Sequence, residues 1–191
     1  MEKLNDLCYM IWRQKMTDEN YFKTNEKELM EYFHYSGFFG KIKLRFRFAK
    51  TWLLHSLAYS SILPNWVVTL QRMRGVEIGK NCHISPYVQI DLLYPEQVTI
   101  EDNVSIGTNS VIFAHVNMPT NMHLKKHAYP RKVEPVRIKS GAVIGPGTII
   151  IAGVTIGKNA MTAVGSVVTQ DVPDSCVAAG NPARVIKKID E

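Results

Sequence analysis

The second half of the chain repeats every six residues from Val76 onward. Cut into hexads, it has twelve third positions of which ten are Ile, and every first position is small or β-branched. Positions one and three point to the same side of an extended segment, so each hexad predicts a short strand with two inward side chains. Sandwich turns recur every 8–12 residues or so, which argues against a β-sandwich. The third positions are Ile78, Ile84, Ile90, Ile100, Ile106, Ile112, Ile138, Ile144, Ile150, Ile156, Thr162 and Val168.

The sixth position of each hexad is Asn, Gly or Asp in nine of the twelve cases. These residues tolerate left-handed backbone angles, so we expect a corner at the end of each hexad. Three hexads then make one coil of a three-sided column, and twelve make four coils. A solenoid needs covered ends. We therefore expect a mostly helical extension over residues 1–75, a β-column over 76–173 with an external loop at 116–135, and a tail over 174–191.

Two insertions interrupt the repeat, Tyr94–Gln97 and Val116–Pro135. Counting three hexads per coil, both leave the same corner, one above the other, and insertions in a solenoid map to loops that carry function. His115 stands at that corner, where the longer insertion opens. A neutral imidazole there suits general base catalysis, in which it accepts a proton from an attacking hydroxyl or amine. The alternative is that His115 only hydrogen-bonds the loop.

Three segments resemble the hexapeptide-repeat (isoleucine-patch) acyltransferases. They are the run from Ile90 to Asn103, the segment Ile112-Phe113-Ala114-His115, and the tail from Gly165 to Pro173 followed by Ala179-Gly180-Asn181-Pro182-Ala183-Arg184. The resemblance implies a left-handed parallel β-helix, a homotrimer with sites between neighbouring columns, and acetyl-coenzyme A as acyl donor. It also implies that His115 deprotonates a carbohydrate hydroxyl of a polysaccharide or lipid-linked glycan precursor, which attacks the thioester directly without a metal.

Asp91 precedes the shorter insertion, on the face that leads to the same corner. Its carboxylate either orients His115 or grips a substrate hydroxyl, or it caps the turn beside Pro95, and the sequence leaves these readings open. The resemblance carries contacts to the acyl donor by position. They fall on Pro146, Val164, Thr169, Gln170, Arg184 and Lys187. Gln170 stands where many members carry Lys, so one phosphate contact is expected to be missing.

The first half contains a basic amphipathic segment at 41–63. Between Lys41 and Gly75 the chain has seven cations and no Asp or Glu, out of a net charge of +6. Apolar residues in this segment fall at helical spacing, at Ile42, Phe46, Ala49, Leu53 and Leu57. We expect this stripe to cap the first coil, and the segment also suits an anionic membrane surface. Charge gathered in one segment argues against a nucleic-acid groove.

The three cysteines are widely spaced and form no CxxC pair, which favours reduced thiols. Because no signal peptide is visible either, we expect a cytoplasmic protein that can lie at the inner face of the membrane. His123 and His127 have zinc-ligand spacing, but Pro119 and Pro130 predict a poor helix there, so we expect no metal. Two other classes remain as alternatives: a γ-type carbonic anhydrase-like metalloenzyme using His83, His115 and His127, and a non-catalytic trimeric scaffold. The same base serves an amine, so O- and N-acetylation are both open.

Overall fold

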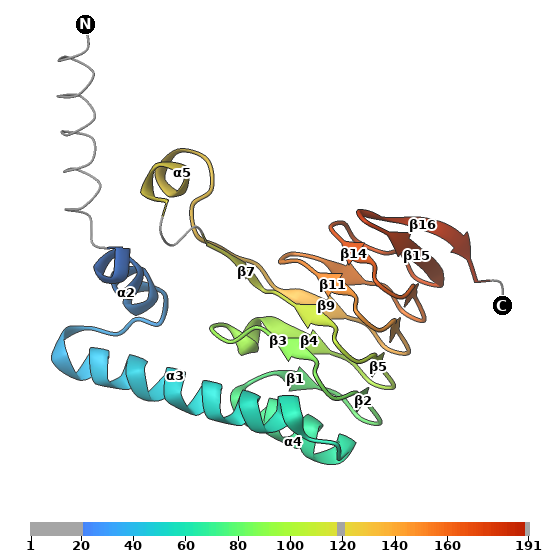
Figure 1. Ribbon diagram of the computed structural model, residues 1–191, viewed down its shortest axis with the longest axis horizontal. Coiled ribbons are helices and arrows are strands. Elements are labelled where there is room, and N and C mark those ends of the chain that lie inside the picture. The colour runs from blue at the N-terminus through green and yellow to red at the C-terminus, as the bar shows by residue number, and fades with distance from the viewer. Residues whose placement is uncertain (1–20, 118–120, 190–191) are drawn as a thin grey trace, which may run out of the picture. The chain divides into compact units, whose positions relative to one another are not determined.

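The structure, a computed structural model, describes residues 21–117 and 121–189. The part of the expected extension before residue 21 lies outside these residues. The chain forms two compact units, residues 1–47 with 117–132 and residues 48–116 with 133–191. Within the described residues the strands are preceded by α2 (Tyr21–Tyr32), α3 (Gly37–Ser60) and α4 (Pro64–Arg74), as Figure 1 shows. None of the described helices combines the length and apolar character that crossing a bilayer requires.

The repeat region forms short parallel strands that enter three sheets in turn (Figure 1). One pass of the chain through the three sheets is called a row below. Each strand aligns with the equivalent strand of the next row, as Ile78 does with Ile100 and Ile100 with Ile138. The first sheet contains β1 (Glu77–Ile78), β4 (Val98–Ile100), β9 (Val136–Ile138) and β12 (Thr155–Ile156). The expected parallel β architecture is confirmed.

The second and third sheets follow the same pattern. The second contains β2 (His83–Ile84), β5 (Ser105–Ile106), β10 (Val143–Ile144), β13 (Met161–Thr162) and β15 (Cys176–Gly180), with β16 (Ala183–Lys188) antiparallel at its edge. The third contains β3 (Gln89–Ile90), β6 (Val111–Ile112), β11 (Ile149–Ile150) and β14 (Val167–Val168). A separate two-stranded sheet pairs β7 (His115–Val116) with β8 (Lys132–Val133).

The core lies between the three sheets, and its composition follows the hexads. Every third position is buried except Ile78, which is half-buried, and every first position is buried except Cys82. One hydrophobic cluster joins residues of all three sheets. Burial of each Ile side chain contributes about 1.5–3 kcal/mol. The Ile side chains stacked at the third positions therefore contribute much of the stability of this unit. Cys82 and Cys176 are free thiols, while Cys8 lies outside the described residues.

The corners confirm the interpretation of the sixth position, with two deviations. Eight of the nine predicted corner residues have positive φ: Asn81, Asn103, Asn109, Asn159, Gly141, Gly147, Gly153 and Gly165. Asp171 is the exception with no positive φ, and its side chain accepts a hydrogen bond of 2.7 Å from the Thr155 amide of the neighbouring row. Tyr87 has a φ of 64° although the sequence gives it no corner preference, and its amide donates to the Tyr59 carbonyl at 2.9 Å.

The Ile-Gly pairs of the repeat have a steric reason. A Cβ built on Gly145 would lie 2.5 Å from the Thr162 carbonyl oxygen and 2.8 Å from the carbonyl carbon of Ala163. Both atoms belong to the backbone of the next row, which cannot move away without breaking the parallel pairing. Glycine at this position therefore permits the close stacking of successive turns.

Helix α4 covers the first row of strands, but the predicted stripe of α3 does not. α4 contacts β1 and β2 and buries Val67 and Val68. On α3, the buried residues include Thr51, His55 and Ala58, whereas the stripe Ile42, Phe46, Ala49, Leu53 and Leu57 is exposed. The expectation that this stripe caps the first coil was therefore wrong. The face that packs instead carries Thr51, His55 and Ala58, and His55 Nδ1 lies 3.1 Å from Nη1 of Arg74.

The other unit joins α2 to the long insertion. Glu28 of α2 accepts hydrogen bonds from Lys125 Nζ at 2.6 Å and from Arg131 Nε at 2.9 Å. Contrary to the expectation from Pro119 and Pro130, the insertion contains a six-residue helix, α5 (Met122–His127). It lies between the two prolines and is capped by the Asn121 side chain, which accepts from the Leu124 amide at 2.9 Å.

Candidate active site

The two insertions leave the column side by side. Strands β3 and β6 are neighbours in the third sheet, with Ile90 aligned to Ile112, and each insertion begins directly after its strand. The Asp91 amide continues this pairing by donating to the Ile112 carbonyl at 2.9 Å. The predicted common edge of the insertions is therefore confirmed, and it brings Asp91 next to the segment that carries His115.

The Asp91 carboxylate uses both of its oxygens. Oδ1 accepts hydrogen bonds from the amides of Leu93 and Tyr94, at 2.9 and 3.0 Å. Oδ2 accepts from the Ala114 amide at 2.8 Å and lies 2.6 Å from Nδ1 of His115. The sequence left open whether Asp91 contacts His115 or caps the turn beside Pro95, and one side chain does both.

The contact fixes the protonation pattern of the imidazole. An ionised carboxylate only accepts hydrogen bonds, so Nδ1 of His115 must carry the proton that it donates to Asp91. In a neutral ring Nε2 then holds the free lone pair. The Asp91 side chain is fully buried, while the His115 side chain keeps 19% of its surface exposed. The arrangement therefore presents a basic nitrogen to a partly open surface, held by a buried carboxylate.

The environment of Asp91 favours its ionised form. Burial by itself would raise the pKa of this carboxyl, but the hydrogen bond and charge of His115 and the amides of Tyr94 and Ala114 hold the pKa below its ordinary value. The Tyr94 ring is fully buried and packs edge-on against the His115 ring, with centroids 5.1 Å apart. Tyr94 thus limits rotation of the imidazole. Sequence reasoning saw it only as part of the four-residue insertion.

A second residue that sequence reasoning missed supports the site from α4. The buried Arg74 guanidinium donates to the backbone carbonyls of Asp91 at 2.6 Å and Ile90 at 3.2 Å. It also donates to Gln71 Oε1 and lies 3.1 Å from His55 Nδ1. Burial lowers the pKa of Arg74 to about 10, partly offset by the charges of Asp91 and Glu96, so it stays protonated at neutral pH.

The six positions expected to contact the acyl donor are all exposed, and the structure places them in three pairs. Pro146 and Val164 follow β10 and β13 at one corner, where the Pro146 carbonyl accepts a hydrogen bond of 2.9 Å from the Gly165 amide. Thr169 and Gln170 follow β14 in the third sheet. His115 follows β6 of the same sheet, and β11 lies between β6 and β14. Arg184 and Lys187 lie on β16, opposite Ala179 and Val177.

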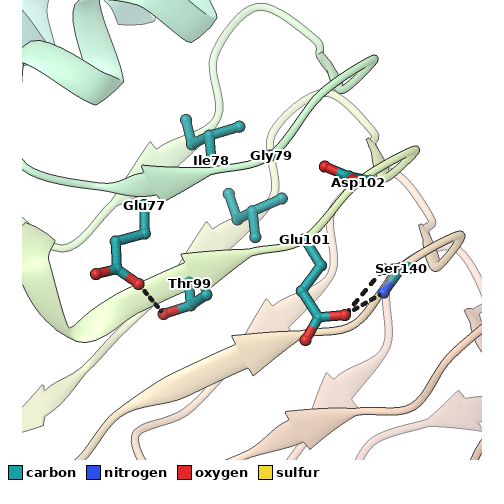
Figure 2. Close-up of a pocket in the computed structure, with 8 residues that line it drawn as sticks. Glu77, Ile78, Gly79, Thr99, Glu101, Asp102 and Ser140 are labelled. Carbon is teal, nitrogen blue, oxygen red and sulfur yellow. Dashed lines mark hydrogen bonds between the residues drawn. The ribbon is translucent and has the colours of Figure 1, made fainter.

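A separate hollow of about 540 Å³ lies over the first sheet and is acidic (Figure 2). Its carboxylates are engaged in the walls: Glu77 accepts from Thr99 Oγ1 at 3.1 Å, and Glu101 from the Ser140 amide and hydroxyl, both at 2.9 Å. Within residues 21–117 and 121–189, no three His, Cys, Asp or Glu side chains are grouped so as to hold a metal ion. His83 lies on β2 of the second sheet, a different face from the one that leads to His115.

The known proteins that this chain resembles include acetyltransferases. The family model described as hexapeptide repeat of succinyl-transferase matches residues 97–116 and 135–170. Galactoside O-acetyltransferase of Escherichia coli strain K12 is 38% identical over 59% of this chain and 57% of its own length. The 2,3,4,5-tetrahydropyridine-2,6-dicarboxylate N-acetyltransferase of Staphylococcus aureus strain MRSA252 is 37% identical over 49% of this chain and 34% of its own length.

Among solved structures, a galactoside acetyltransferase in complex with coenzyme A is similar with a TM-score of 0.61. It is 28% identical, and the match covers 77% of this chain and 82% of that one. The chain spans less than two thirds of the length of either curated relative. The residues that the family model matches lie within the repeat region and include His115, Pro146, Val164, Thr169 and Gln170.

Proposed function

Since this chain belongs to the hexapeptide-repeat acyltransferases, we propose that it is an acetyl-coenzyme A-dependent O-acetyltransferase that modifies a carbohydrate hydroxyl. The observation that carries the proposal is the contact of 2.6 Å between Asp91 Oδ2 and His115 Nδ1. It leaves Nε2 as the acceptor for a substrate proton. Named relatives that bind coenzyme A or acetylate a galactoside support the donor and the acceptor class.

The reaction needs one base and no covalent enzyme intermediate. Nε2 of His115 takes the proton of the acceptor hydroxyl as its oxygen attacks the thioester carbonyl carbon. The tetrahedral intermediate expels the coenzyme A thiolate, which takes the proton back from the imidazolium. Asp91 stabilises the positive charge that His115 carries between these steps. Backbone N–H groups at a corner would hold the oxyanion, each contributing about 3 kcal/mol.

The proposal includes the finer architecture that the family implies. The column is a left-handed β-helix of four coils over residues 76–173, preceded by the extension 1–75 and followed by the tail 174–191. Three copies form a homotrimer, with each site between neighbouring columns. Support comes from the placement of the donor contacts in separate pairs: Pro146 and Val164 follow the second sheet, whereas His115 follows the third. A second column beside the first would allow one donor molecule to reach positions that a single column keeps apart.

The galactoside O-acetyltransferase relative supports a carbohydrate as the acceptor class. We assign a polysaccharide or lipid-linked glycan precursor, acetylated on the cytoplasmic side where acetyl-coenzyme A is available. No resident metal takes part in the proposed chemistry. Arg184 and Lys187 are assigned to the phosphates of the donor, because both are exposed cations on the terminal hairpin. Gln170 can form a hydrogen bond there but supplies no charge.

The test replaces His115 by Ala and measures thiol release from acetyl-coenzyme A with a panel of sugars, nucleotide sugars and amines. Turnover should fall by at least about a hundredfold, since a positioned base contributes 10²–10⁴ in rate. Binding of coenzyme A, followed by calorimetry, should stay unchanged. His83→Ala is the matched control, because His83 is exposed on a different sheet. Retained turnover in His115→Ala, or equal loss in both variants, would contradict the assignment.

A further inference from the structure

Helix α3 presents apolar side chains to solvent on the side opposite to its buried face. At about 100° per residue, Ile42, Phe46, Leu53 and Leu57 fall within one arc of about 60°. These four side chains are between 47% and 72% exposed. The buried residues Leu44, Thr51, His55 and Ala58 fall within an arc centred about 160° away. The outward arc is therefore not the face by which the helix packs in its own chain.

Cations border this arc on both sides. On the same projection Lys50 and Lys43 lie just beyond one end of the arc, and Arg45 lies about 60° beyond the other end, with Lys41 farther round the helix. Lys43, Arg45 and Lys50 are exposed, and Lys41 forms an ion pair of 2.6 Å with Glu26. Trp52, 64% exposed, lies beside Arg45 on this projection, about 80° from the nearer end of the arc. Long cationic side chains beside an exposed apolar face are features of a helix that rests in a membrane interface.

The charge pattern favours lipid over a second copy of the chain. The segment from Lys41 to Gly75 has seven cations and no acidic residue. Two copies meeting through this face would bring like charges together around the apolar contact, which is unfavourable. A bilayer with anionic headgroups instead accepts the apolar side chains between its acyl chains and pairs its phosphates with the bordering cations.

We propose that α3 is an interfacial helix that docks this protein on a bilayer containing anionic phospholipid, through Ile42, Phe46, Leu53 and Leu57 with Lys43, Arg45 and Lys50 at the headgroups. Docking uses none of the residues assigned to acetyl transfer. The two functions can therefore fail independently. A docked enzyme would find acceptors that are themselves anchored in the lipid.

The test is flotation of the full chain with phosphatidylcholine vesicles prepared with and without phosphatidylglycerol. The protein should float only with the anionic vesicles, and added salt should weaken binding. Lys43→Gln with Lys50→Gln should lower partitioning about 25-fold, at about fivefold for each cation. Phe46→Ser with Leu53→Ser should lower it about tenfold or more, because the apolar contact is lost. Met73→Ser, at a 54% exposed position of α4, is the matched control and should bind as the unchanged protein does.

All four substituted positions of α3 are exposed, so thermal unfolding of these variants should match that of the unchanged protein. Absence of flotation with anionic vesicles overturns the proposal. So does equal flotation of the Phe46→Ser, Leu53→Ser variant. If that variant instead separates a multimer into smaller species by light scattering, the face is a contact between copies and the lipid assignment is wrong. The acetyl transfer assay in detergent-free buffer reports separately on the active site.

Discussion

Arg74 donates a hydrogen bond of 2.6 Å to the backbone carbonyl of Asp91, the residue whose side chain contacts His115. The last turn of α4 is thereby joined to the segment that orients the proposed base. Arg74 reaches no exposed surface of the site, so it acts through Asp91 as a positioning residue. The relationship gives the buried arginine at the end of α4 a hydrogen-bonding role, since it also donates to the Ile90 carbonyl.

We predict that Arg74→Met lowers kcat more than it raises KM, because the imidazole is no longer held in one orientation. Stability should fall by about 2–4 kcal/mol, since the acceptors on Gln71, Ile90 and Asp91 lose a buried donor. Arg74→Lys should recover part of kcat, as an ammonium can still donate to the Asp91 carbonyl. Arg72→Met, at an exposed site of the same helix, is the control and should change kcat little. Unchanged kcat in Arg74→Met would show that the contact is only structural.

Asp91→Asn tests the proton pattern at His115. The asparagine amide can donate to Nδ1, which moves the ring proton to Nε2 and removes the acceptor that the reaction needs. We expect kcat to fall about a thousandfold or more, as in other His–carboxylate pairs, with coenzyme A binding retained in calorimetry. Asp102→Asn is the control, because Asp102 accepts from the Lys80 amide in the acidic hollow. A loss of less than tenfold in Asp91→Asn would refute the orienting role.

Gly145→Ala tests the steric reason for the Ile-Gly pairs. Its Cβ would meet the Thr162 carbonyl oxygen at 2.5 Å, and this atom is fixed by parallel pairing. We expect a loss of about 1–3 kcal/mol in denaturant unfolding, the usual cost of overpacking. Gly165→Ala is the matched comparison, because its Cβ meets nothing within 4 Å although its φ is +70°. It should cost about 1–2 kcal/mol from backbone strain alone. A loss below about 1 kcal/mol in Gly145→Ala would contradict the close-stacking account.

The features that the sequence predicts well depend on the repeat itself. A period of six with inward positions one and three fixes which side chains enter the core, because the strand alternates sides at every residue. The same count places both insertions after neighbouring strands, which is why the sequence puts Asp91 on the face that leads to His115 while leaving the role of its carboxylate open. Left-handed corners at Asn and Gly follow from backbone sterics, and those at eight predicted positions are present.

Other features were wrong or missed because they depend on partners outside the repeat. Apolar periodicity cannot choose between two helix faces, and on α3 the hydrogen bond between Arg74 and His55 accompanies burial of the more polar face. Arg74 was counted only as one of seven cations, since nothing in its sequence neighbourhood marks it as buried. The short helix α5 depends on the Asn121 cap between two prolines, a local signal that the prolines obscured.

Burial of His55 gives a pH dependence that can be measured. Burial and the positive charge of Arg74 lower the pKa of His55 to about 4, whereas an unfolded histidine has a pKa near 6.5. Between these values the unfolded chain binds more protons than the folded one, so stability rises with pH. We therefore expect the contribution of neutral His55 to the free energy of unfolding to be complete above pH 6.5 and to be lost as the pH falls toward about 4.

Urea unfolding measured across this pH range should show this dependence of the free energy of unfolding on pH in the unchanged protein. His55→Gln should remove it, since its amide oxygen accepts from Arg74 without titrating, and His34→Gln, at an exposed histidine, should retain it. Identical slopes in the unchanged protein and in His55→Gln would show that His55 titrates normally when folded.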